Sequence, residues 1–327
     1  MIYTVTLNPT IDRTIHFPQV VVGALNRATR SVTDLSGKGV NVSVALSRFG
    51  LESVLTGFVA GVYGRVLVEG LRAQGYTCAF LELAEGETRS NITVIDAGSG
   101  VTTKLNEPGP TVGEEDIARL AAWLVEQCQS APVEEGAMPH VVIFSGSAPP
   151  GAPPDAYARL IEAVQGCGAV AVLDSSGSAL QAGCAARPAW LKPNEVEAME
   201  LTGCTPEDLR APEALPEITA AIRRLGPGRV LLSLGERGAV YDDGDMVWLA
   251  EPPPITELSA VAAGDAALAG ALWAWLSGPA LVGAHIVRWA VATGAATAAH
   301  DGSGIPSRGR IDALYTNVTT RPLGAAR

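Results

Sequence analysis

Residues 34–46, DLSGKGVNVSVAL, join a glycine-rich turn that carries one lysine to an apolar stretch with helical character. A nucleotide-binding P-loop requires the pattern G-x-x-x-x-G-K-[ST], in which backbone N–H groups surround a phosphate and a hydroxyl reaches Mg2+. Here Gly39 follows Lys38 where a hydroxyl residue belongs, and Val32 occupies the position of the first glycine. The dinucleotide pattern G-x-G-x-x-G also fails, because Val42 replaces its third glycine. What remains is a cationic turn at a helix N-terminus, a general site for an anion.

Apolar runs alternate with amphipathic stretches on both sides of this turn. Strand candidates lie at 2–7, 54–59, 141–144, 169–173 and 230–234, with helix candidates at 40–49, 63–74, 114–128, 154–164 and 194–201. This alternation predicts an α/β fold, a mostly parallel sheet with helices on both faces. Ligands in such folds bind at the carboxyl ends of the strands.

Two stretches break this rhythm, at about 13–33 and 89–104. Both read as short alternating strands with no helix nearby, so they predict a small second sheet that stands off the core. The simpler interpretation is a long β-hairpin excursion. No internal repeat appears, and we expect residues 1–327 to form a single domain.

The charge balance limits the partners. The chain has 23 basic and 34 acidic residues, a net charge of −11, and no run of Lys or Arg, so nucleic acid and anionic membranes are poor candidates. Residues 266–287 carry no formal charge, but Ser277-Gly278-Pro279 interrupts them, which favours two buried helices over a membrane span. Five widely spaced cysteines and no signal-peptide pattern predict reduced thiols and a cytoplasmic location.

A second informative stretch is AVAAGDAALAGAL, residues 260–272. Small residues lead into Gly264 and Asp265, after which an apolar helix begins. The backbone N–H groups of 262–265 would therefore sit at a helix N-terminus, which favours negative charge. An acidic residue in the first helical turn is equally typical of simple capping, so this stretch alone leaves both interpretations open.

Ten short motifs taken together resemble the PfkB/ribokinase family of sugar kinases. In order they are TLNPTID (6–12), LNR (25–27), SGKGVNV (36–42), ETRSN (87–91), LNEPGP (105–110), GSAPPG (146–151), LDSSG (173–177), LKPNEVE (191–197), SLGERG (233–238) and AAGD (262–265). The chain is most similar to the hexose-phosphate branch, 1-phosphofructokinase and tagatose-6-phosphate kinase. The resemblance implies a ribokinase-like fold in which the small sheet is a lid over the substrate.

The resemblance also implies an acceptor site for a sugar phosphate, formed by Asp12, Arg27, Gly37, Lys38, Asn41, Arg89, Asn91 and Ser147. Asp12 and Asn41 would hold sugar hydroxyls, and Lys38 would lie beside the sugar phosphate. Arg27 and Arg89 would clamp that phosphate, since a guanidinium binds phosphate bidentately. Ser147 has the alternative interpretation of a tight turn after a strand.

For the donor side, the resemblance implies an ATP site at Lys192, Asn194, Ser233, Gly235 and Gly238. Asn194 and Glu197 would orient Mg2+ through water, although an exposed helix acid is the plainer interpretation of Glu197. Asp265 would be the catalytic base. The N–H groups of Ala262, Ala263 and Gly264 would stabilise charge on the transferred group. A helix N-terminus should lower the pKa of Asp265 and weaken it as a base.

The implied reaction is ATP-dependent conversion of fructose 1-phosphate to fructose 1,6-bisphosphate. Tagatose-6-phosphate kinase is the nearest alternative. Ala262 stands where the family has glycine, and its methyl group disfavours a positive φ, so a catalytically weak sugar-phosphate-binding regulator is a further alternative. The exposed edges of a lid sheet make a homodimer through the lid an expectation. The preferred hexose phosphate and any allosteric ATP site stay open.

Overall fold

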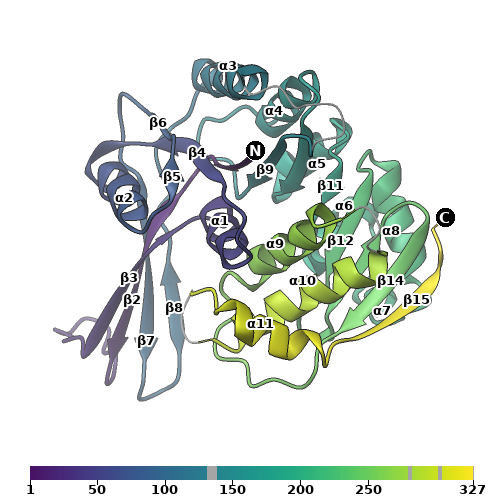
Figure 1. Cartoon of the computed structure of the whole chain (residues 1–327). Helices are drawn as coiled ribbons and strands as arrows, with labels where there is room; N and C mark the ends of the chain where they lie inside the picture. Colours follow the sequence, from purple (N-terminus) through teal and green to yellow (C-terminus); the bar gives the residue numbers. More distant parts are fainter. Residues whose placement is uncertain (131–137, 279–281, 301–303, 327) are drawn as a thin grey trace.

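The computed structural model describes residues 1–130, 138–278, 282–300 and 304–326. A large sheet crosses the molecule, and a small sheet projects from one side of it (Figure 1). The strands of the large sheet, in chain order, are β1 (Ile2–Thr6), β4 (Val54–Val59), β5 (Thr77–Cys78), β6 (Leu81–Glu82), β9 (Val141–Ser145), β10 (Val170–Asp174), β11 (Trp190–Leu191), β12 (Arg229–Ser233), β13 (Ala239–Asp242), β14 (Met246–Glu251) and β15 (Thr319–Ala325).

Their spatial order is β15-β14-β13-β12-β11-β10-β9-β1-β4-β5, with β6 also paired to β4. Pairing is parallel from β12 through β1 to β4, β5 and β6, and antiparallel from β12 to β15. The predicted α/β fold with a mostly parallel sheet is confirmed. The parallel strands all end at one edge of the sheet, which is where the site is assembled.

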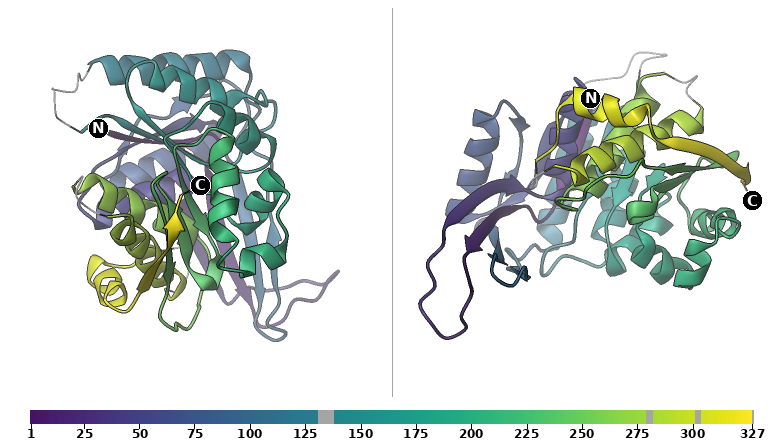
Figure 2. Two further views of the ribbon diagram at one scale, coloured as in Figure 1. Left: turned by 90° about the vertical axis from the view of Figure 1, so that its right-hand side faces the viewer. Right: turned by 90° about the horizontal axis from the view of Figure 1, so that it is seen from below.

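Helices cover both faces of this sheet (Figures 1 and 2). One face carries α3 (Glu114–Ser130), α4 (Ala156–Gln165), α5 (Gly177–Ala185), α6 (Glu195–Thr202), α7 (Pro206–Arg210) and α8 (Leu215–Arg224). The other carries α1 (Lys38–Arg48), α9 (Ala263–Leu276), α10 (Gly283–Ala298) and α11 (Arg308–Tyr315). The short helix η1 (Gly235–Arg237) follows β12, and α2 (Gly61–Ala73) packs against the base of the small sheet.

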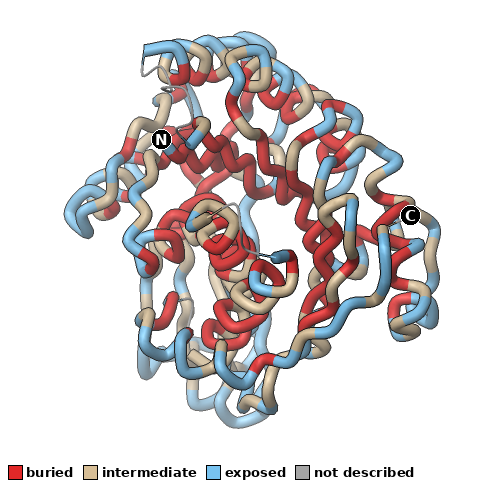
Figure 3. The backbone as a smooth tube through the Cα atoms, turned by 45° about the vertical axis from the view of Figure 1, so that its right-hand side comes forward, coloured by how far each residue is buried: buried red, intermediate tan, exposed pale blue. Residues whose placement is uncertain are grey.

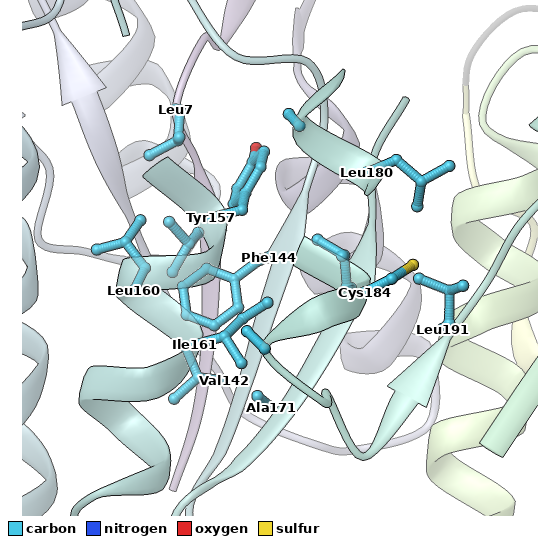
Figure 4. Close-up of a cluster of buried hydrophobic side chains, with 14 of the residues drawn as sticks. Leu7, Val142, Phe144, Tyr157, Leu160, Ile161, Ala171, Leu180, Cys184 and Leu191 are labelled. Atoms are coloured by element: carbon cyan, nitrogen blue, oxygen red, sulfur yellow. The ribbon is translucent and has the colours of Figure 1, made fainter. Parts of the chain in front are cut away.

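Hydrophobic clusters lie on each side of the large sheet, and a third lies between α2, β4 and the small sheet. Figure 3 shows that the buried parts of the backbone run through the middle of the molecule. Strand β9 contributes to the clusters on both sides of the large sheet, because successive side chains of a strand point to opposite faces. Val142 and Phe144 pack against α4 and α5 (Figure 4), whereas Val141 and Ile143 face the layer that includes α9 and α10. Each such side chain stabilises the fold by about 1.5–3 kcal/mol when fully buried, which explains why the strand is continuously apolar.

The small sheet has the order β3-β2-β7-β8, formed by β3 (Arg30–Ser36), β2 (Thr10–Phe17), β7 (Arg89–Asp96) and β8 (Thr102–Leu105). Its central pair, β2 and β7, is parallel and comes from two distant segments of the chain. The small second sheet is therefore present, rather than an isolated hairpin. Residues 18–29 connect β2 to β3 and extend away from the body of the molecule (Figure 2).

Two features of the C-terminal half bear on the predictions. The antiparallel strands β13, β14 and β15 were not predicted. Two of them flank an Asp/Gly-rich turn, and β15 contains Pro322 and Gly324, residues that weaken a strand pattern. The two predicted buried helices are confirmed as α9 and α10, although Pro279 lies outside the described residues. Within the described ranges, none of the helices has the length and hydropathy needed to cross a membrane.

Candidate active site

The turn before α1 is held tightly against the end of β1. Gly37 has φ 144°, and a Cβ added there would lie 2.9 Å from Thr6 Cγ2 and 3.3 Å from Pro9 Cα. Any other residue type would be strained at this φ, and its Cβ would crowd Thr6 and Pro9. The turn therefore directs Lys38 and Asn41, on the first turn of α1, toward the carboxyl edge of the sheet.

Asp265 lies at the start of α9, with only 6% of its surface exposed. Its Oδ2 accepts a 2.8 Å hydrogen bond from Nδ2 of Asn41. Burial, and next the nearby carboxylate of Asp174, raise the pKa of Asp265 to about 6. The helix N-terminus was expected to lower the pKa of Asp265, but burial and the Asp174 carboxylate outweigh that effect. The carboxylate therefore has a pKa suited to a general base near neutral pH.

Asp174, the last residue of β10, is fully buried and contacts two lysines. Lys38 Nζ donates to Oδ1 at 3.1 Å, and Lys192 Nζ forms an ion pair with Oδ2 at 3.4 Å. Burial opposes the charge of Asp174, but the two lysines lower its pKa overall. Burial likewise opposes the charge of Lys38, yet the carboxylates of Asp174 and Asp265 raise its pKa. Sequence reasoning quoted the LDSSG motif and gave Asp174 no role.

The small sheet presents polar groups to this region. Asp12 and Asn91 are register partners on β2 and β7, and Asn91 Nδ2 donates to Asp12 Oδ1 at 3.1 Å. Arg89 alternates onto the same face, where one Nη donates to the backbone oxygen of Asn8 at 2.9 Å. Burial lowers the pKa of the Arg89 guanidinium. Arg89 Nε and Asn91 Oδ1 are buried without a hydrogen-bond partner, and unpaired buried polar atoms are typical of a ligand site.

One predicted acceptor residue, Arg27, lies apart from this group. Arg27 is exposed in the loop beyond the paired residues His16 and Arg30. Arg89 is level with Thr10, so Arg27 is roughly 20 Å away along the strands. Ser147 is exposed after β9 and follows Gly146, where an added Cβ would stand 3.9 Å from Lys38 Cβ. The carbonyl of Gly146 accepts from the hydroxyls of Tyr157 and Ser175 at 2.9 and 3.0 Å. The structure therefore does not bring Arg27 to the other clamp residue.

A cavity of about 770 Å3 opens on the other side of Asp265. Six of the predicted donor or anion-hole residues line it: Asn194, Ser233, Gly235, Gly238, Ala263 and Gly264. Its other walls, which were not predicted, include Arg237, Pro252, Ala290 and Gly294. Lys192 lies beside it, with Nζ 3.5 Å from the point where a Cβ on Gly264 would stand. Helix α10 contributes small residues to the wall, a pattern that the sequence gives no local reason to single out.

Asn194 and Glu197 form a reciprocal cap at the start of α6. Asn194 N donates to Glu197 Oε2 at 2.8 Å, and Glu197 N donates to Asn194 Oδ1 at 2.9 Å. Glu197 is only 5% exposed, so the plainer interpretation as an exposed helix acid is wrong; burial raises its pKa. The second carboxylate oxygen takes no part in this cap. No cluster of three His, Cys, Asp or Glu residues suited to direct ligation occurs in the described part of the chain.

Ala262, the N-cap of α9, has φ 62° and ψ −1°, in the left-handed region. This conformation costs a non-glycine residue about 1–2 kcal/mol, but it does not require glycine. The first-turn N–H groups that follow have no partner within the helix. The substitution of alanine for glycine therefore leaves the helix N-terminus in a geometry that can bind an anion, at some cost in stability.

The chain was compared with known proteins. Residues 5–309 match the model of the pfkB family of carbohydrate kinases. The chain is 35% identical to a 1-phosphofructokinase of Bacillus subtilis over 83% of this chain and 84% of that protein, and 34% identical to one of Rhodobacter capsulatus over 98% of each. It superposes with TM-score 0.84 on Escherichia coli phosphofructokinase-2 in complex with fructose-6-phosphate, at 28% identity over 97% of this chain and 98% of that one.

Proposed function

Because the chain belongs to the pfkB family of carbohydrate kinases and is an ATP-dependent sugar kinase, we propose that its acceptor is fructose 1-phosphate and its product fructose 1,6-bisphosphate. The observation that supports this most is the position of Asp265. Its buried carboxylate lies between Asn41, on the acceptor side, and a cavity that is large enough for a nucleotide.

In the proposed reaction, the acceptor hydroxyl attacks the γ-phosphate of ATP in line. Asp265 accepts the hydroxyl proton, and a pKa near 6 keeps it ionised at neutral pH while still basic. Negative charge on the transferred group faces the N-terminus of α9. There the first-turn N–H of Gly264 has no partner within the helix, and the N–H of Ala263 makes only a 3.4 Å hydrogen bond to the carbonyl of Ala260. Lys38 and Lys192 supply positive charge beside it. Phosphoryl transfer depends mainly on this positioning.

The acceptor's own phosphate would lie under the small sheet, which we propose acts as a lid. Arg89 and Asn91 sit on the face of the lid opposite α2, and both have buried polar atoms without partners. A phosphate that accepted hydrogen bonds from the Arg89 guanidinium would hold the lid closed over the substrate. The closed lid would exclude water from the site. Asp12 and Asn41 would contact sugar hydroxyls. Arg27 would join the clamp only if the loop of residues 18–29 moved toward the site.

We propose that Mg2+ accompanies the nucleotide. Asn194 and Glu197 would hold it through water, at the edge of the cavity that Asn194 lines. When bound, the ion neutralises charge on the nucleotide phosphates. The carboxylate of Glu197 is preorganised for this by its hydrogen bond to the Asn194 backbone.

A homodimer through the lid is part of the proposal. The lid face that carries Ile11 and Leu35 packs against α2 at its base. Farther out, Ile15, Val94 and Leu105 alternate onto the same face, and Leu105 is 54% exposed. A second lid would cover this apolar surface and the sheet edges.

All five cysteines are free, which supports the cytoplasmic location proposed from the sequence.

Parallel assays of ADP release test the proposed substrate. Purified protein with Mg-ATP would be supplied with fructose 1-phosphate, fructose 6-phosphate or tagatose 6-phosphate. The proposal expects the highest kcat/KM with fructose 1-phosphate. A higher kcat/KM with tagatose 6-phosphate would assign the alternative kinase, and saturable binding without any turnover would assign a regulator.

A further inference from the structure

We infer that Asp174 is a positioning residue, which holds Lys38 and Lys192 as a pair on either side of the transferred phosphoryl group. This rests on the proposed kinase function. The two lysines come from opposite halves of the site: Lys38 from the turn on the acceptor side, and Lys192 from the residue after β11, next to Gly264 on the nucleotide side. Asp174 is the group that contacts both.

The contacts restrict the separation of the lysines. Each of the two carboxylate oxygens of Asp174 takes one ammonium, at 3.1 and 3.4 Å. The two ammonium groups are therefore held at the two oxygens of one carboxylate despite their repulsion. The two ammonium groups lie between the proposed acceptor site and the proposed ATP site, on the path that the γ-phosphoryl group would take. Holding charged donors in place before the reaction is a large part of enzymatic rate enhancement.

The cluster of charges around Asp174 is buried. Asp174 is 0% exposed and Lys192 only 4%. Burial removes the hydration of both ions, so their pairing has to offset that cost. The lysines also face the carboxylates of Asp265 and Glu197. Asp174 differs from these two because it contacts both ammonium groups directly, so loss of its charge should release both lysines.

A second buried carboxylate shows what a purely structural pair looks like in this chain. Asp242, at the end of β13, is also 0% exposed and pairs with one cation, Arg223, at 3.5 Å. Its Oδ1 also accepts from the N–H of Gly244 at 2.9 Å. Asp242 thus pairs with one cation where Asp174 pairs with two, and none of the three residues lines the 770 Å3 cavity. Asp242→Asn is therefore the matched control for losing a buried ion pair.

The test compares wild type, Asp174→Asn, Asp174→Glu and Asp242→Asn with fructose 1-phosphate and Mg-ATP. Asp174→Asn should lower kcat about 100-fold, the cost of misplacing reacting groups by about 1 Å. KM for each substrate should change by only a few-fold. Asp174→Glu keeps the charge but moves it, so its kcat should also fall by at least about 10-fold. Asp242→Asn should lower Tm and leave kcat near that of wild type.

The pH profile separates positioning from simple destabilisation. Asp174 is one of the charged groups facing Asp265, with Lys38 and Lys192, and Asn41 is its hydrogen-bond donor. Loss of the Asp174 charge should move the acid limb of kcat/KM to lower pH in Asp174→Asn. In Asp174→Glu the limb should stay in place. A loss of packing alone would move neither limb.

Several results would overturn the inference. The inference is wrong if Asp174→Asn has the kcat of wild type. If the Asn variant does not fold, a wild-type kcat in Asp174→Glu overturns the inference instead. A full recovery of kcat in Asp174→Asn at high Mg2+ would also overturn it, because Asp174 would then act on the metal. If the wild-type protein turns over none of the hexose monophosphates, the proposed function is wrong. The wild-type assay shows this independently of the variants.

Discussion

Asn41 donates a 2.8 Å hydrogen bond to the carboxylate of Asp265 across 224 residues of sequence. This bond joins the first turn of α1 to the first turn of α9, so the glycine turn before α1 and the helix that lines the 770 Å3 cavity meet at Asp265. It also favours the ionised form of Asp265, against the effects of burial and of Asp174. The reactivity of Asp265 is thereby tied to the position of α1.

The first prediction concerns the pH profile. The acid limb of kcat/KM should reflect a base with a pKa of about 6, because the protonated carboxyl cannot accept the acceptor's proton. Asn41→Leu removes the hydrogen bond that lowers this pKa, so the limb should move to higher pH. A phosphate monoester also titrates near pH 6, so the difference between wild type and variant is the quantity to measure. An unmoved limb would show that Asp265 does not govern it.

The second prediction concerns stability. The pKa of Asp265 is raised from 3.8 to about 6 on folding, so its ionisation opposes folding. The protonated form is favoured at low pH, and that advantage is lost as pH rises from about 4 through 6. Asp265→Asn should therefore stabilise the protein at pH 7.5 by about 3 kcal/mol, and by much less at pH 4.5. Denaturant unfolding at both pH values measures this. A less stable variant at pH 7.5 would contradict the proposed burial cost.

The third prediction concerns Ala262. Its left-handed conformation is strained for alanine and relaxed for glycine. Ala262→Gly should therefore keep kcat within about three-fold of wild type and change stability by no more than about 1 kcal/mol. Ala262→Val should lower both, because a β-branched residue tolerates a positive φ poorly. A large gain in kcat for Ala262→Gly would mean that alanine does impair the anion site.

The fourth prediction separates the two arginines. Arg89 is partly buried beside Asp12 and has an unpaired Nε, whereas Arg27 is exposed at the far end of the lid. Arg89→Ala should raise KM for the sugar phosphate by about 10- to 100-fold, because the charge-assisted hydrogen bonds to its phosphate are lost. KM for ATP should change little. Arg27→Ala is the matched control and should leave both values near wild type. A comparable rise in KM for the sugar phosphate with Arg27→Ala would show that the lid loop reaches the site.

Much of the fold followed from the sequence because its signals are local. Apolar strand runs, small residues before α9 and the glycine turn at 37–39 each specify their own conformation. The site was partly predictable for the same reason, since Asn41 and Asp265 lie at helix starts. Asp174 was missed because its partners come from two distant elements. The pKa of Asp265 was misjudged because burial, which depends on the whole fold, outweighs the local effect of the helix.

Glu197 and Arg27 illustrate the same limit. Helix periodicity suggests an exposed side chain at Glu197, but packing beside Lys192 buries it. The motif that contains Arg27 shows which residue of the family it corresponds to. The length of β2 and β3 determines how far Arg27 lies from Arg89. Strand length and lid position depend on pairing between segments, which no short motif records.

The most direct test measures turnover and binding together in Asp265→Asn. Wild type should release ADP with fructose 1-phosphate, and the variant should lose about 100- to 10,000-fold in kcat, the usual contribution of a general base. Calorimetry should find fructose 1-phosphate bound with nearly wild-type affinity, because Asn41 and Arg89 are intact. Turnover near wild type, or loss of binding with kcat preserved, would contradict the assignment of Asp265 as the base.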